Sequence, residues 1–120
     1  MLYVYHHKVT GELLLRFDAE GREEILNSLK WAVKALDHEF LLPDTELMAG
    51  LSPAWQPCDF VNIMPAPNTE EPLRISVGIE ITGGCSVLAA LGAQLSALPE
   101  NVREIILDKS GIHCSASLPI

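Results

Sequence analysis

Two patterns of apolar residues succeed one another along the chain, one with the period of a strand and one with that of a helix. Residues 2–7 and 12–17 are rich in β-branched, aromatic and aliphatic side chains, and Gly11 between them can take the left-handed conformation of a tight hairpin. Over residues 19–37 the period becomes helical, and Asp18 precedes this stretch as the expected N-cap. The apolar face of the predicted helix contains Ile25, Leu26, Leu29, Ala32, Val33 and Leu36.

The rest of the chain predicts four strands and one further helix. Residues 58–64 are expected to form a strand, and alternation of apolar and polar side chains predicts another over 73–81, with one face buried. An uncharged helix is expected over 85–98, directly after a Gly-Gly pair. Residues 103–108 and 112–118 are expected to form a last hairpin.

This order of elements, ββα-ββ-α-ββ, is typical of a single α+β domain over residues 1–120. We expect a mostly antiparallel sheet with both helices packed on one face. Residues 41–56 show little periodicity and carry Pro, Gly and Ser, so an irregular connection is expected there. The expected core includes Leu29, Val33, Ile75, Val77, Leu91 and Ile106.

The chain is strongly acidic, with 16 acidic residues against 8 basic ones and a net charge of −8. Nucleic acids and anionic membranes are poor partners for such a chain, because their phosphates require a basic surface. A basic protein partner is favoured instead. The sequence shows no transmembrane span and no secretory signal, and its three cysteines, Cys58, Cys85 and Cys114, lack the spacing of a metal site. We therefore expect free thiols and a cytoplasmic location.

Most of the negative charge lies in residues 35–73, which include seven acidic residues and no lysine or arginine. This stretch also contains Trp55, between Pro53 and Pro57. A tryptophan surrounded by carboxylates suits the binding of a basic protein, since the ring supplies desolvated area and the acids speed encounter. In the alternative, the ring folds back over the core while the acids face water. The predicted partner-binding residues are Asp37, Glu39, Asp44, Glu46, Trp55 and Asp59.

The candidate enzyme chemistry centres on Cys85, which follows the Gly-Gly pair at a strand-to-helix junction. Such a junction favours a reactive thiolate, through free backbone N–H groups and the helix dipole. His113 is the candidate base, with His38 as a second choice. Asp108 or Glu80 would orient that base. In the alternative, Cys85 is a small packed residue that begins a buried helix, and we expect it to be buried and unreactive at neutral pH.

No metal or cofactor site is predicted. His6 and His7 are adjacent on a strand, so their side chains point to opposite faces and cannot hold one ion together. The Gly-Gly pair lacks the lysine of a phosphate-binding loop and the glycine spacing of a dinucleotide-binding loop.

Two helical features point to contacts beyond the core. The helix expected over 85–98 has its leucines on one side and Ala89, Gly92 and Ala93 on the other, with no charge on either. Both sides are therefore expected to pack, against the first helix or against a second copy in a homodimer. The second candidate function is accordingly a structural or adaptor protein that acts mainly through self-association. Trp31 lies roughly opposite the apolar stripe of the first helix, where a loop covers it or an interface includes it.

Three segments within residues 79–120 follow one another as strand, helix and strand: Ile79-Glu80-Ile81-Thr82-Gly83-Gly84, Val87-Leu88-Ala89-Ala90-Leu91 and Glu104-Ile105-Ile106-Leu107-Asp108, before a closing strand. This succession resembles the C-terminal part of small bacterial immunity proteins from polymorphic, contact-dependent toxin systems. The resemblance implies a small cytoplasmic protein that occludes a toxin domain. Together with the charge, it predicts a non-enzymatic binding protein whose specific function is toxin neutralisation. A thiol enzyme built on Cys85 is the third class considered.

Overall fold

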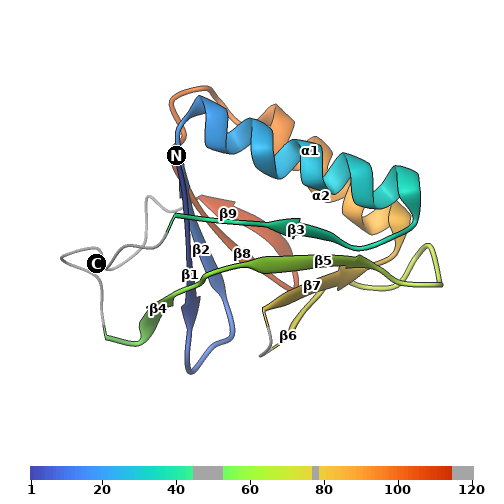
Figure 1. The fold of residues 1–120 in the computed structure, drawn as a ribbon, viewed down its shortest axis with the longest axis horizontal. Coiled ribbons are helices and arrows are strands. Elements are labelled where there is room, and N and C mark those ends of the chain that lie inside the picture. Colours follow the sequence, from blue (N-terminus) through green and yellow to red (C-terminus); the bar gives the residue numbers. More distant parts are fainter. Residues whose placement is uncertain (45–52, 77–78, 115–120) are drawn as a thin grey trace.

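The computed structural model describes residues 1–44, 53–76 and 79–114. Over these residues the chain forms two helices and nine strands in two sheets (Figure 1). The helices are α1 (Ala19–Ala35) and α2 (Cys85–Ala97). The strands are β1 (Leu2–His7), β2 (Leu13–Phe17), β3 (Glu39–Leu41), β4 (Trp55–Pro57), β5 (Val61–Pro65), β6 (Arg74–Ser76), β7 (Glu80–Gly83), β8 (Glu104–Asp108) and β9 (Gly111–Cys114).

The α+β class and the predicted order of the elements are confirmed. A five-stranded sheet has the order β4-β1-β2-β8-β9, with every neighbouring pair antiparallel. A four-stranded sheet has the order β3-β5-β7-β6, in which only β5 and β7 run parallel among the described strands. Both helices lie on the same side of the strands (Figure 1). The first hairpin turns as expected, with Gly11 at a φ of 78°.

The strand predicted over residues 73–81 is wrong, because the chain reverses within it. β6 and β7 pair as an antiparallel hairpin in which Ile75 faces Ile81, and the N–H of Ile79 donates to the carbonyl of Ser76 at 2.8 Å. Ile75 and Ile81 therefore share a face across two strands, as they would have along one strand. The connection predicted over residues 41–56 overlaps strands only at its ends, since β3 ends at Leu41 and β4 begins at Trp55.

One core lies between the helices and one face of each sheet. Its buried residues are Leu2, Val4, Leu13, Leu15, Phe17, Ile25, Leu29, Ala32, Leu41, Cys58, Val61, Ile63, Leu73, Ile81, Leu88, Leu91, Leu95, Ile105 and Leu107. The predictions for Leu29 and Leu91 are confirmed, while Val33 and Ile75 are only partly buried against this core. The expected core residue Val77 lies outside the described residues.

The placement of Ile106 in this core was wrong. Side chains alternate along β8, so Ile105 and Leu107 face the helices and Ile106 faces the opposite side of the sheet. There it packs against a second, smaller cluster made by Tyr5, Leu14 and Trp55. Three consecutive apolar residues in β8 gave no sequence signal for which face is which.

Polar contacts at their ends hold the two helices in place. Asp18 is the N-cap of α1, as predicted, since its Oδ1 accepts from the N–H of Gly21 at 2.8 Å. Arg22 of α1 reaches the C-terminal end of α2, where its guanidinium donates to the carbonyls of Leu95 at 2.6 Å and Pro99 at 3.0 Å. The carbonyl of Leu95 also accepts from the N–H of Leu98 at 3.3 Å, and that of Pro99, beyond the helix, accepts from the N–H of Val102 at 3.1 Å. The guanidinium adds a positive charge at the negative end of the α2 dipole.

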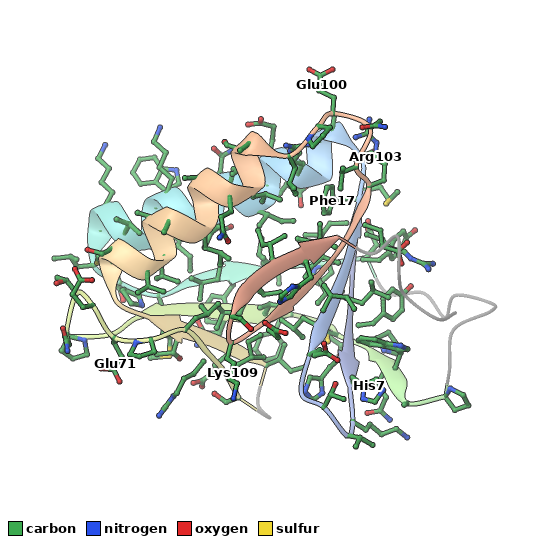
Figure 2. The ribbon with its side chains drawn as sticks, turned by 180° about the vertical axis from the view of Figure 1, so that it is seen from behind. His7, Phe17, Glu71, Glu100, Arg103 and Lys109 are labelled. Atoms are coloured by element: carbon green, nitrogen blue, oxygen red, sulfur yellow. The ribbon has the colours of Figure 1, made fainter. Side chains whose placement is uncertain are left out.

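The loop after β5 packs on the N-terminal end of α2. The N–H of Gly84 donates to the carbonyl of Glu71 at 2.9 Å, and that of Ser86 donates to Thr69 at 3.1 Å. Figure 2 shows Glu71 beside the start of this helix.

Within the described residues, no helix is long and apolar enough to cross a membrane.

Candidate protein-binding surface

The acidic residues predicted to contact a partner fall into two groups. Asp37 follows α1, Glu39 begins β3 and Asp59 precedes β5, so these three flank the neighbouring strands β3 and β5 (Figure 1). Asp37 and Asp59 are exposed, and Glu39 is partly buried. Asp44 is instead tied to β1, where its Oδ2 accepts from the N–H of Leu2 at 3.3 Å and its own N–H donates to the carbonyl of Leu2 at 2.8 Å. Glu46 lies outside the described residues.

Trp55 is buried rather than presented on the surface. It lies in the edge strand β4, is only 8% exposed, and packs with Tyr5 and Leu14 on the sheet face away from the helices. Its ring meets the imidazole of His7 edge-on, with the centroids 4.8 Å apart and the planes at 87°. This is the arrangement of the alternative hypothesis, in which the ring covers apolar surface. Trp55 is therefore a packing residue of the five-stranded sheet and not an exposed anchor for a partner.

A different set of rings is exposed beside the acids. His38, Phe40 and Phe60, here called the aromatic row, contact one another in sequence. The centroids of His38 and Phe40 are 5.1 Å apart and those of Phe40 and Phe60 are 6.1 Å apart, both in edge-to-face geometry. Phe40 is 50% exposed and Phe60 is 46% exposed. The sequence contained a signal for this row: in His38-Glu39-Phe40-Leu41, side chains of a strand alternate, so a buried Leu41 turns Phe40 outward.

Further features of the four-stranded sheet lie next to the aromatic row. Asn62 of β5 is paired with Phe40 of β3, and Met64 follows two residues later on the same face. Among the described residues, the side-chain carbonyl oxygen of Asn62 is buried without a hydrogen-bond partner. An unsatisfied buried acceptor costs roughly 1–3 kcal/mol, so a donor that reached it would be favourable. Exposed apolar side chains border the row, with Leu42 at 75% and Met64 at 37%.

Cys85 and His113, the first candidate pair of the thiol site, do not come together. Cys85 is partly buried at the start of α2, rather than fully buried as predicted, and its sulfur lies 4.0 Å from the carbonyl oxygen of Val33. His113 is paired with Ile106, on the face of the five-stranded sheet that points away from the helices. The sheet therefore separates this histidine from α2.

His113 does form the predicted pair with Asp108. Its Nε2 lies 3.0 Å from Oδ1 of Asp108, which also accepts from the N–H and the hydroxyl of Ser110. Partial burial would raise the pKa of Asp108, but these hydrogen bonds outweigh it and hold the pKa below its usual value. Asp108, Ser110 and His113 thus join the two ends of the β8–β9 turn through exposed hydrogen bonds, an arrangement that is common in turns.

We expect Cys58 to resist alkylation in the folded protein. Its side chain is 2% exposed, and burial, with a smaller effect of Asp59, raises the pKa of its thiol to about 11. At pH 7 only about one molecule in 10⁴ then carries the thiolate that reacts. Iodoacetamide labelling followed by peptide mass spectrometry, on folded and on urea-unfolded chain, measures this protection. Equal labelling of Cys58 in both states would contradict the structure, while fast labelling of Cys85 alone would favour the thiol enzyme.

Trp31, the second tryptophan, is half-exposed on α1, with 50% of its surface accessible, and the Nζ of Lys34 lies 5.0 Å from its ring centroid.

Within the described residues, no three His, Cys, Asp or Glu side chains gather as metal ligands would. In comparisons with known protein families, with curated proteins and with solved structures, none matches this chain.

Proposed function

We propose that this chain is a non-enzymatic protein-binding domain that contacts a basic protein partner through the aromatic row and the acids beside it. The observation that carries the proposal is the exposure of Phe40 and Phe60, two phenylalanine rings in mutual contact at 6.1 Å, each about half accessible. Aromatic side chains of this kind are enriched where proteins bind proteins, because a rigid ring buries much apolar area with little loss of entropy.

Charge supports a basic partner. Asp37 and Asp59 are exposed and directly precede His38 and Phe60 in the chain, within a stretch that has seven acids and no lysine or arginine. Glu39 lies on the opposite face of β3 from Phe40. Carboxylates at the rim of an interface mainly accelerate and orient the encounter with a positive surface.

Neutralisation of a toxin domain is the specific case we propose. The resemblance of residues 79–120 to small immunity proteins supports it, as does a surface fitted for a basic protein. Such a protein acts by covering the active surface of the toxin, in the same cytoplasm, without chemistry of its own. Self-association as the main function has a separate structural basis, which lies on the helices.

A site-specific cross-link identifies the partner. A photoreactive phenylalanine analogue at position 40 should cross-link one basic protein in an extract of the native host. The same analogue at position 9, where Val9 is 84% exposed on the first hairpin, is the matched control and should not. If both positions capture the same proteins, this surface is not the binding site.

Kinetics with the purified partner test the roles of the residues. Phe40→Ala and Phe60→Ala should each speed dissociation about 30-fold, equivalent to ~2 kcal/mol, if the rings are central anchors. Asp37→Lys combined with Asp59→Lys should instead slow association and reduce its dependence on salt. Glu24→Lys, an exposed charge reversal on α1, is the control and should have little effect. Unchanged dissociation for both phenylalanine variants would refute the proposal, and loss of protection against a toxin by the same variants would support the specific case.

A further inference from the structure

The two helices form a layer whose outer side faces away from both sheets (Figures 1 and 2). On that side a groove of about 480 Å³ runs between α1 and α2. Apolar residues make most of its lining, among them Leu26, Val33, Leu88, Ala89, Gly92 and Ala93. Lys30 and Lys34 border it on the α1 side. Open apolar grooves between helices are common places for a second molecule to bind.

The α2 side of the groove is unusual for a surface helix. Cys85–Ala97 contains no charged residue, although Ala89, Ala93 and Ser96 are all exposed. A helix of a monomer normally carries charge on the side that meets water. Small residues such as Ala89 and Gly92 also allow another helix to approach closely, because no long side chain stands between the two backbones.

The outer ridge of α1 carries charges in a self-complementary order. Its residues are Glu20, Glu23, Asn27, Lys30 and Lys34. Spacings of three and four residues place all five on one side of the helix, and all five are exposed. Within the described part of the chain, none of the four charged residues forms an ion pair. Acids occupy the half before Asn27 and lysines the half after it.

We propose that the helical layer is a homodimer interface, in which α1 of a second copy packs antiparallel to α1 about a two-fold axis at Asn27. Glu20 and Lys34 lie seven residues on either side of Asn27, and Glu23 and Lys30 lie four and three residues away. In an antiparallel pair Glu20 therefore meets Lys34 of the second copy, and Glu23 meets Lys30 of the second copy. The aliphatic stems of the lysines and the uncharged face of α2 supply the apolar contact.

A second copy fits this surface better than an acidic or a basic partner. An interface related by a two-fold axis must be its own complement, and this ridge is its own complement only in the antiparallel sense. A uniformly charged partner would meet like charges along half of it. The helix dipole alone explains acids near the start of α1 and lysines near its end, but it does not explain an uncharged groove beside them.

Charge-reversed variants test the dimer directly by sedimentation velocity. The variant with Lys30→Glu and Lys34→Glu has an all-acidic ridge, and the variant with Glu20→Lys and Glu23→Lys has an all-basic one. Each alone should lose at least about tenfold in association constant, because like charges then face each other. An equimolar mixture of the two should regain the dimer as a heterodimer, and circular dichroism checks that each variant is folded.

A substitution in the groove tests the apolar part. Ala93→Arg should abolish the dimer, whereas Ala97→Arg, also exposed on α2 but outside the groove, should retain it. The proposal is overturned if the wild-type chain is monomeric up to about 1 mM, if the mixture of folded charge variants stays monomeric, or if Ala93→Arg leaves the dimer intact. Phe40→Ala lies on the other surface and should not change the dimer, so failure here is distinguishable from failure of partner binding.

Discussion

Replacing Trp55 with alanine should lower the free energy of unfolding by about 3–5 kcal/mol. The ring is 8% exposed and, with Tyr5 and Leu14, fills the apolar cluster on the face of the five-stranded sheet opposite the helices. Truncation leaves a cavity there and removes the edge-to-face contact with His7. Urea unfolding followed by circular dichroism measures the change.

Trp31→Ala is the matched control for this prediction. Trp31 is 50% exposed, so its loss should change stability by no more than about 0.5 kcal/mol. Partner binding separates the two views of Trp55. A variant that keeps wild-type stability but loses the partner would restore Trp55 as an exposed anchor, contrary to the packing seen here.

Gly84→Ala should lower the free energy of unfolding by about 3 kcal/mol or more. A Cβ at this position would lie 2.1 Å from the carbonyl oxygen of Thr69 and 2.2 Å from its carbonyl carbon. Both atoms are backbone, so no side-chain rotation relieves the clash. Either the loop or α2 must move, and the hydrogen bonds from Gly84 to Glu71 and from Ser86 to Thr69 would be lost. The denaturant midpoint is the measurement.

Gly92→Ala on the same helix should have the opposite effect. The nearest atom to a Cβ there is the Cδ1 of Leu29 at 3.9 Å, an ordinary contact. Alanine in a helix interior is more favourable than glycine, so stability should rise by about 0.5–1 kcal/mol. Both variants are compared with the wild type at the same low protein concentration, so that self-association does not enter the comparison. If Gly84→Ala is as stable as the wild type, the loop does not pack on α2 as described.

The helices could be predicted from the sequence, because the residues that set the helical period and those that cap a helix lie close together along the chain. Asp18 precedes α1 and accepts from Gly21 three residues later, and such a contact can be read from the sequence. The alternation of apolar and polar residues misled where one long strand and a hairpin of two short strands produce the same alternation. Ile75 and Ile81 share a face either along one strand or across the hairpin of β6 and β7, and the sequence does not distinguish the two.

The candidate site depended on contacts that no local pattern contains. Trp55 is buried because β4 pairs with β1, whose His7 is opposite it but far away in the sequence. The acids Asp37, Glu39 and Asp59 were predicted from charge alone, and charge places residues on a surface without saying which ring accompanies them. Phe40 was missed because the alternation that turns it outward can be used only once β3 and the burial of Leu41 are known, and a three-residue strand is too short to show a period by itself.

The pairing of β2 with β8 has a consequence for synthesis on the ribosome. β8 lies between β2 and β9 in the five-stranded sheet, and Arg16 contacts Glu104 across a separation of 88 residues at 2.9 Å. Until β8 has emerged from the exit tunnel, β2 has one unpaired edge, and its buried leucines lack the strand that covers them. The five-stranded sheet therefore cannot be completed until β8 has been made, and binding of a chaperone to the first hairpin and α1 would protect them during that interval.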